Sequence, residues 1–189
     1  MDVDLLGQQL TFIREAERLK NVLRSGHTSQ GRAESTAEHS WRLCLMVLVF
    51  ARELEGLDLA RLLQICIVHD LGEAISGDIP AVDQHAVPDK AENERRDLLQ
   101  LLAPLPAGQQ AHFVGLWDEY EQARTPEARA AKALDKLETI IQHNQGANPP
   151  DFDYLFNLDY GRKYTRAEPL FAQLRELVDA DTRRRAAGG

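Results

Sequence analysis

The residues best suited to chemistry crowd into one short stretch, where His69, Asp70, Glu73 and Asp78 stand within ten residues. Residues 62–68 before it are too apolar on every side for a surface helix, so a buried helix is expected to carry His69 and Asp70 into the interior. A buried carboxylate is costly unless it is paired or coordinates a metal. An isolated His–Asp pair is usually a hydrogen-bonded core pair, but the density of ionisable groups here favours a functional site.

A second histidine can reach this stretch through the arrangement of the helices. Residues 37–54 and 58–70 both read as buried helices, and the connection between them is short. Consecutive helices with a short connection are antiparallel neighbours, so the start of the first lies beside the end of the second. This geometry predicts that His39 lies close to His69 and Asp70.

Two imidazoles and two carboxylates form a donor set that suits an exchangeable divalent ion and hydrolysis. Such a set can leave coordination positions open for water and for a substrate oxygen. Mn, Co, Mg, Fe and Zn all fit it, and the sequence does not select among them. Asp135 lies beside the apolar stripe of a later helix, where a lone aspartate is more often partly exposed, so its position alone does not assign it to the set.

The periodicity of apolar residues predicts an all-α fold of about six or seven helices, with the metal site between the central ones and no strands. Three helix starts have local signals: Ser35 with Glu38 in capping-box spacing, Asp58, and Thr125 before Pro126. The predicted helices cover residues 5–23, 37–54, 58–70, 90–102, 107–123, 125–144 and 166–184. The predicted loops cover residues 24–32, 81–89 and 146–162.

The 189 residues fit one domain, taken as residues 1–189. The net charge of −8 argues against a nucleic acid polymer as partner, because such binding depends on lysine and arginine. No apolar run approaches the roughly 20 residues of a membrane span, and the acidic start lacks a secretion signal, so a cytoplasmic protein is expected. Cys44 and Cys66 lie in apolar helical runs and read as free, buried thiols.

Four segments in this order resemble the HD-domain phosphohydrolase superfamily, and within it the branch of small helical 5'-deoxynucleotidase-like enzymes. They are residues 34–42 (ESTAEHSWR), 69–80 (HDLGEAISGDIP), 117–121 (WDEYE) and 132–138 (KALDKLE). The resemblance spans most of the chain, and the order His…His-Asp…Asp with Glu-x-x-x-x-Asp after the pair is specific. It implies an HD-domain helical bundle, and a homodimer, which the family commonly forms.

The resemblance also implies a role for each residue of the site. The implied metal ligands are His39, His69, Asp70 and Asp135. Glu73 is implied to activate or position the attacking water, and Asp78 to contact the substrate at its sugar. Arg24 falls where the family has an arginine that contacts the phosphate.

The expected function is hydrolysis of (deoxy)nucleoside 5'-monophosphates to nucleoside and phosphate by metal-activated water. Some characterised relatives have a Trp after the arginine that helps to exclude a 2'-hydroxyl. This chain has Ser25 there, so the choice between ribose and deoxyribose stays open, as does the base.

Two alternatives to this function remain. One is a phosphatase for another phosphate ester in a specialised pathway, and the other is a non-catalytic regulatory module that binds metal and nucleotide. The presence of Glu73 and Asp78 beside the ligands favours an enzyme, because a sensor needs no carboxylate to position water.

Overall fold

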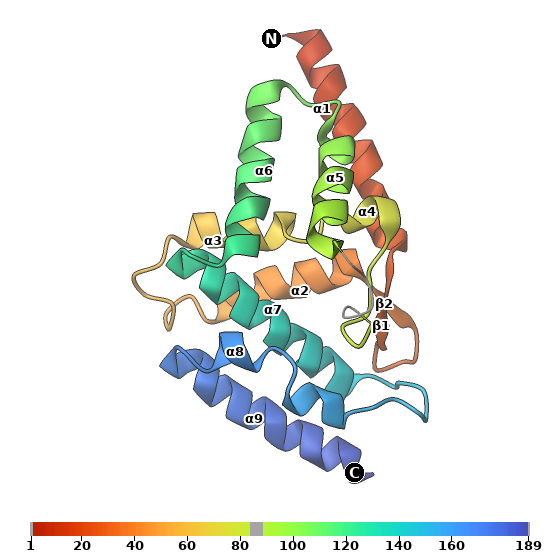
Figure 1. The fold of residues 1–189 in the computed structure, drawn as a ribbon, viewed down its shortest axis with the longest axis vertical. Coiled ribbons are helices and arrows are strands. Elements are labelled where there is room, and N and C mark those ends of the chain that lie inside the picture. The colour runs from red at the N-terminus through yellow and green to blue at the C-terminus, as the bar shows by residue number, and fades with distance from the viewer. Residues whose placement is uncertain (1, 84–88, 189) are drawn as a thin grey trace.

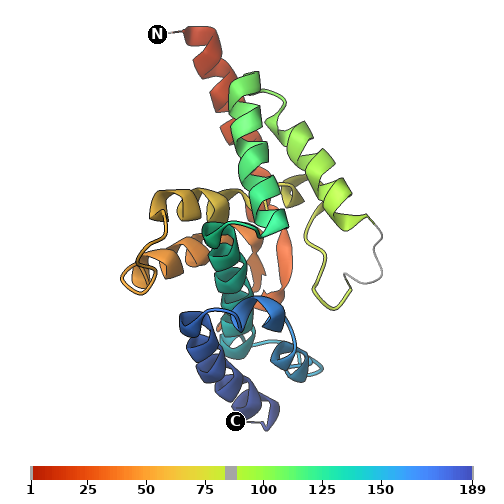
Figure 2. The same ribbon diagram turned by 60° about the vertical axis from the view of Figure 1, so that its left-hand side comes forward.

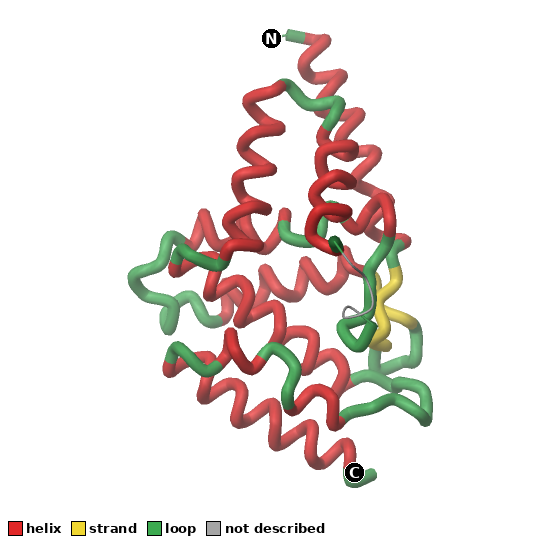
Figure 3. The backbone as a smooth tube through the Cα atoms, in the orientation of Figure 1, coloured by secondary structure: helices red, strands yellow, loops and turns green. Residues whose placement is uncertain are grey.

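The computed structural model describes residues 2–83 and 89–188, and these are built mostly from helices (Figure 1 and Figure 3). The elements in chain order, with η for a 3₁₀ helix, are α1 (Val3–Ala16), η1 (Glu17–Asn21), β1 (Leu23–His27), β2 (Ala33–Ser35), α2 (Thr36–Val49), α3 (Leu59–Val68), α4 (Glu73–Ser76), α5 (Lys90–Leu102), α6 (Ala107–Gln122), α7 (Pro126–Gln145), η3 (Leu155–Leu158), α8 (Arg162–Thr165) and α9 (Pro169–Ala186). Within the described residues, α1, α2, α3, α5, α6, α7 and α9 have ten or more residues each. The predicted all-α class is confirmed.

Helix α7 forms the centre of the molecule. It starts as predicted, with Pro126 in its first turn and the Thr125 hydroxyl accepting a hydrogen bond from the amide of Ala128 at 3.1 Å. Most of its side chains are buried, because α2, α3, α6, α8 and α9 all pack against it. Figure 1 and Figure 2 both show α7 crossing the middle of the fold, with α9 below it and α6 above. Residues of α7 are therefore within reach of both halves of the chain.

Helices α2 and α3 pack side by side against α7, as the short connection predicted. The predicted capping box is present: the Ser35 hydroxyl accepts from the Glu38 amide, and the Glu38 carboxylate accepts from the Ser35 amide at 2.9 Å. Asp58 caps α3 through a bond from the Arg61 amide at 3.0 Å. Both helices end earlier than predicted, and His69 takes the position after the last residue of α3.

The prediction that both helices are buried all round is wrong for their outer faces. Leu45, Leu48 and Val49 on α2 and Ile67 on α3 are each more than two-fifths exposed. Cys66 on the inner face of α3 is a buried free thiol as predicted, whereas Cys44 is half-buried. One side of this helix pair therefore faces solvent with apolar side chains.

The prediction of no strands is also wrong, because β1 and β2 pair as an antiparallel hairpin. Helix α1 ends at Ala16, the 3₁₀ helix η1 follows, and the backbone becomes extended at Val22, directly before β1. The hairpin turn closes with a bond from the Thr28 amide to the Arg32 carbonyl at 2.7 Å. Strand bonds join residues that are distant in sequence, so the helical period of the apolar residues before Arg24 gives no sign of them.

Helices α5 and α6 form an antiparallel pair beside α1 at the upper end of Figure 1. Part of the predicted loop 81–89, residues 84–88, lies outside the described residues. The predicted loop 146–162 contains the short helix η3, and α9 begins at Pro169, three residues later than predicted. The two ends of the chain lie at opposite ends of the molecule in both ribbon views (Figure 1 and Figure 2). Among the described residues, no helix combines the length and the apolar character that crossing a membrane requires.

Candidate metal centre

His69 is held in the tautomer that a metal ligand needs. Its ring is buried, and Nδ1 lies 2.8 Å from the carbonyl oxygen of Cys66, which can only accept, so Nδ1 carries the proton. The lone pair is therefore on Nε2, which is buried without a hydrogen-bond partner and lies 3.0 Å from Oδ2 of Asp70. Two hydrogen-bond acceptors at this distance repel each other unless a cation lies between them.

His39 approaches the same point from the first turn of α2. Its Nδ1 contacts the carboxylate of Glu138, and its Nε2 is buried, without a hydrogen-bond partner, 3.2 Å from Oδ1 of Asp135 and 3.7 Å from Oδ2 of Asp70. Burial and the charge of Arg24 oppose protonation of the ring, yet Glu138 and Asp135 raise the pKa of His39 to about 10. The carboxylates around this ring thus attract a cation strongly.

Asp135 on α7 presents one oxygen to this cluster and secures the other. Oδ2 accepts from the hydroxyl of Tyr120 at 2.5 Å and from the ammonium of Lys136 at 2.8 Å, which leaves Oδ1 facing His39. Burial raises the pKa of Asp135, but Lys136 and the histidines hold it well below its usual value. The carboxylate is therefore ionised and oriented by its neighbours.

The four predicted ligands meet at one place, where α2, α7 and the end of α3 converge. Donor atoms of His39, His69 and Asp70 lie within 4.8 Å of one another, and Asp135 stands beside them. Two buried imidazole nitrogens without hydrogen-bond partners and two carboxylates whose pKa values are held below the usual value are the donors that a divalent ion needs, and such an ion would replace the proton on His39. The residues present fit such an ion.

A second group of donors lies on the other side of His39 and fits an ion less well. It consists of Glu34, His39 and Glu138. The Glu138 carboxylate already accepts from Nε of Arg42 at 2.5 Å, so a guanidinium neutralises it. Glu138 therefore serves to orient His39, as the carboxylate partner of a metal-binding histidine does.

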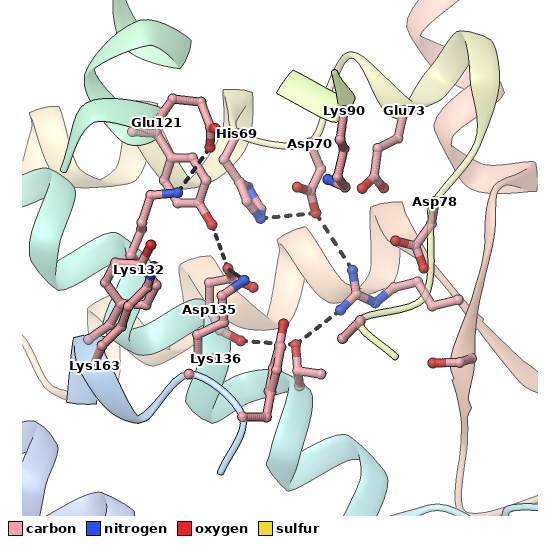
Figure 4. Close-up of a pocket in the computed structure, with 18 of the residues that line it drawn as sticks. His69, Asp70, Glu73, Asp78, Lys90, Glu121, Lys132, Asp135, Lys136 and Lys163 are labelled. Atoms are coloured by element: carbon pink, nitrogen blue, oxygen red, sulfur yellow. Dashed lines mark hydrogen bonds and ion pairs between the residues drawn. The ribbon is translucent and has the colours of Figure 1, made fainter. Parts of the chain in front are cut away.

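A cavity of about 650 Å³ opens beside the metal centre and is lined by Arg24, Glu73 and Asp78 among others. Figure 4 shows Glu73, Asp78 and Lys90 on one side of it, next to Asp70, while Lys132 and Lys163 lie on the opposite side. The prediction that Glu73 and Asp78 share a site with the ligands agrees with this geometry. The roles of Glu73 in positioning water and of Asp78 in contacting the sugar stay predictions.

Glu73 is buried at the start of α4, in a turn where Gly72 permits close packing. A Cβ at Gly72 would come 2.5 Å from the carbonyl oxygen of Glu94 on α5. Glu73 accepts a hydrogen bond from the Thr36 hydroxyl at 3.1 Å. Burial, and then the charges of Asp70 and Asp78, raise its pKa well above the usual value. Burial likewise raises the pKa of Asp78, which Arg24 opposes.

Arg24 lies on β1 and not in a loop, and its guanidinium enters the cavity next to the metal centre. Nη2 donates to the Thr139 hydroxyl at 3.0 Å, Nη1 lies 3.7 Å from Asp70, and Nε lies 3.5 Å from Glu34. Burial alone lowers its pKa, but the carboxylates of Asp70 and Asp78 raise it above the usual value. A permanent cation therefore faces the cavity beside Asp70.

Several residues at the site were not predicted from the sequence, among them Glu138, Tyr120 and Lys136. The sequence could have identified Glu138, because it follows Asp135 by three residues on the same helix and so shares its face. Tyr120 and Lys136 orient Asp135, and no local pattern indicates that contact.

Residues 16–175 match the profile of the HD domain family. The chain belongs to this family, and its metal centre and cavity give it the class of a metal-dependent phosphohydrolase. The 5'-deoxynucleotidase HDDC2 of Bos taurus is 34% identical over 138 residues, which are 72% of this chain and 66% of that protein. The 5'-deoxynucleotidase HDDC2 of Dictyostelium discoideum is 27% identical over 188 residues, covering 93% of this chain and 99% of that protein.

A solved structure shares the fold over nearly its whole length. It is described as a predicted metal-dependent phosphohydrolase from Magnetospirillum magnetotacticum, with a TM-score of 0.83 and 32% identity over 96% of this chain and 94% of that chain. The predicted HD-domain bundle is confirmed.

Proposed function

We propose that the protein is a 5'-nucleotidase that hydrolyses nucleoside 5'-monophosphates to nucleoside and phosphate. The observation that carries the proposal is the guanidinium of Arg24, held 3.7 Å from Asp70 at the edge of the metal centre and open to the same cavity. A phosphate that binds there would contact the permanent cation of Arg24 and, at the same time, the group of four predicted metal ligands. The relatives named 5'-deoxynucleotidase support a nucleoside monophosphate as the substrate.

Each residue has a part in this mechanism. His39, His69, Asp70 and Asp135 would hold the divalent ion, which when bound lowers the pKa of water and polarises phosphoryl oxygens. Arg24 binds and neutralises the phosphate. Glu73 lies on the Asp70 side of the cavity (Figure 4), where it orients the attacking water and accepts its proton.

Asp78 and Ser25 bear on the sugar. Asp78 lines the cavity on the same side as Glu73. Its carboxylate can accept a hydrogen bond that a sugar hydroxyl donates. Ser25 follows Arg24, lines the cavity and is short. We therefore expect that the site admits both ribose and deoxyribose.

We also propose that the catalytic unit is one domain over residues 1–189 and that it works as a homodimer. Trp41, Leu45 and Leu48 lie at helical spacing on one face of α2, and each is more than two-fifths exposed. A dimer would bury this apolar face. Sedimentation analysis should give the mass of a dimer for the parent and of a monomer for Leu48→Glu, and a monomeric parent would contradict the proposal.

The function is tested with metal-stripped protein before and after addition of Mn²⁺, Co²⁺, Mg²⁺, Fe²⁺ or Zn²⁺ separately. Phosphate release is measured from ribo- and deoxyribonucleoside 5'-monophosphates and from sugar phosphates without a base. The proposal expects metal-dependent release from the nucleotides. Faster release from another ester would favour a phosphatase of a different pathway, and tight nucleotide binding without release would indicate a regulatory module.

A further inference from the structure

A second cavity of about 340 Å³ adjoins the active-site cavity, and we refer to it as the side cavity. The residues that line both cavities are Ser25, Ala81, His143 and Phe156. Val82, Pro149 and Phe152 add further apolar lining to the side cavity alone. A ligand with its phosphate beside Arg24 could thus extend past Ser25 into an apolar space.

The aromatic rings of the side cavity are held by neighbouring rings and stay partly accessible. The ring centroids of Phe152 and Tyr154 lie 5.0 Å apart, and Phe156 stacks on Tyr160 with centroids 5.6 Å apart. Phe152 and Phe156 are half-buried, and Phe152 is oriented by the ring of His143, with centroids 4.8 Å apart and planes at 74°. On the opposite wall of the active-site cavity, one face of the Tyr120 ring is already covered, because Lys132 Nζ lies 4.0 Å from its centroid. Figure 4 places Lys132 and Lys163 on that wall, away from Asp78. An uncharged flat group therefore fits the side cavity better than the lysine wall.

The wall that carries Phe152 and Phe156 is fixed by buried hydrogen bonds. Arg175, which is buried, donates to the carbonyl oxygens of Asn157, Leu158 and Tyr160 at 2.7 Å each. Such a preorganised wall loses little entropy when a ligand binds.

The polar groups of the side cavity disfavour a second anion. His143 donates from Nδ1 to Oδ1 of Asn157 at 2.9 Å, so its Nε2 keeps a lone pair. Burial lowers the pKa of His143 below its usual value, which keeps the ring neutral at neutral pH. Asp151 and Asp153 also line this space, and their carboxylates would repel a phosphate. Acceptors of this kind suit the N–H groups of a neutral heterocycle.

The two cavities adjoin beside the proposed phosphate contact. Arg24 and Ser25 are consecutive on β1, Arg24 lines the active-site cavity, and Ser25 lines both cavities. β1 also lies close against His143, since a Cβ at Gly26 would come 3.1 Å from its ring. One substrate can therefore span both cavities.

We propose that the side cavity binds the purine or pyrimidine base of the substrate, with the base stacked on Phe152. The inference rests on the proposed nucleotidase function and extends it to the part of the substrate that does not react.

The test compares the parent with Phe152→Ala, Phe152→Trp and Leu155→Ala. Leu155 is the matched control, because it belongs to the same segment, is 58% exposed and lines neither cavity. kcat and KM are measured for the nucleoside 5'-monophosphate that the parent hydrolyses fastest and for ribose 5-phosphate, which lacks the base. Binding of the corresponding free nucleoside is measured by calorimetry.

Phe152→Ala should lower the ratio of kcat/KM between nucleotide and ribose 5-phosphate about 5- to 150-fold, through the KM for the nucleotide. This range corresponds to the roughly 1–3 kcal/mol that stacking of a base on an aromatic ring contributes. The variant should also weaken binding of the free nucleoside by a similar factor. Phe152→Trp should restore both, and Leu155→Ala should resemble the parent.

An unchanged ratio in Phe152→Ala, with nucleotide hydrolysis intact, would overturn the base site and leave the proposed function standing. Equal losses for Phe152→Ala and Leu155→Ala would likewise overturn it, since they would indicate a general loss of structure. A parent that hydrolyses no nucleotide, yet binds free nucleoside in a Phe152-dependent way, would reject the function and retain the base site.

Discussion

Oδ1 of Asp135 lies 3.2 Å from Nε2 of His39, although the two residues stand on different helices of the core. The same carboxylate is held through its other oxygen by Tyr120 and Lys136, and the same imidazole is held through its other nitrogen by Glu138. Each ligand therefore has one atom fixed by the protein and one atom directed at the metal centre. The ligands and the residues that orient them can therefore be replaced one at a time, and the effect of each replacement on metal binding can be measured.

Replacing a ligand should remove the metal. His69→Ala and Asp70→Ala each leave an incomplete donor set, whose remaining members are costly to keep buried without an ion. Elemental analysis of the purified variants should show less than one-tenth of the metal of the parent. His112→Ala, at an exposed histidine of α6, should keep the parent's content. Stoichiometric metal in both ligand variants would exclude this pair from the centre.

Glu138→Gln should weaken metal binding without abolishing it. The contact between Glu138 and Nδ1 of His39 fixes the ring, and loss of such a partner typically lowers metal affinity about 10- to 100-fold. Competition with a coloured chelator measures the affinity directly. Glu121→Gln is the control, because Glu121 also lines the cavity but pairs with Lys132 at 2.9 Å. Equal affinities for Glu138→Gln and the parent would mean that the contact only fills space.

The sequence predicted those parts of the fold and site that local chemistry decides. Ser35 and Thr125 cap their helices as expected, because a short oxygen side chain at that position satisfies free amides whatever the rest of the chain does. The proximity of His39 and His69, whose ring centroids lie 5.5 Å apart, was predicted from the packing of consecutive helices as neighbours, although the connection over residues 50–58 is longer than expected.

The remaining features depend on contacts between distant residues. The β1–β2 hairpin is formed by pairing, and Arg24 reaches the cavity only because this hairpin directs it toward Thr139 on α7. Lys136 pairs with Asp135, its neighbour in sequence, although a helix normally directs consecutive side chains apart. The buried surroundings of the two residues determine this contact. Periodicity carries no information about such pairs.

Stability should respond to acid through Glu38. The hydrogen bond from Arg32, together with bonds from Ser35, lowers the pKa of Glu38 to about 2 from a usual value near 4.5. A lowered pKa in the folded state means that the ionised carboxylate stabilises the fold at pH above about 4.5. That contribution is lost as the pH falls toward 2.

Glu38→Gln should therefore reduce the free energy of unfolding at pH 7 by about 1 kcal/mol, the size expected for a partly exposed ion pair at a helix cap. The difference between the variant and the parent should shrink between pH 4.5 and pH 2. Urea unfolding across this range measures it. A difference that stays constant with pH would show that the charge of Glu38 contributes nothing.

Arg24→Ala should weaken phosphate recognition. Hydrogen bonds to a charged group contribute roughly 1.5–3 kcal/mol, so kcat/KM should fall about 10- to 100-fold, and inorganic phosphate should inhibit less well. Metal content should stay the same, because the proposed partner of the guanidinium is the substrate. Arg32→Ala is the control, since Arg32 belongs to the same hairpin but pairs with Glu38 outside the cavity. A parental kcat/KM in Arg24→Ala would make Arg24 a structural residue.

The last prediction concerns Glu73, which is 5% exposed and lies on the Asp70 side of the cavity in Figure 4. As the group that orients the attacking water and accepts its proton, it should affect turnover and not binding. Loss of a general base typically lowers the rate about 10²- to 10⁴-fold, and kcat of Glu73→Ala should fall by at least the lower figure.

Glu73→Gln separates proton acceptance from packing, because glutamine keeps the volume of the side chain and can still accept from Thr36. It should lose kcat to a similar extent as Glu73→Ala, while both variants keep the parent's metal content and bind the nucleotide with a similar dissociation constant. Elemental analysis, calorimetry and a phosphate-release assay on one preparation test the three statements together. Full turnover in Glu73→Gln with metal bound would remove proton transfer from the role of Glu73 and leave activation of the water to the ion.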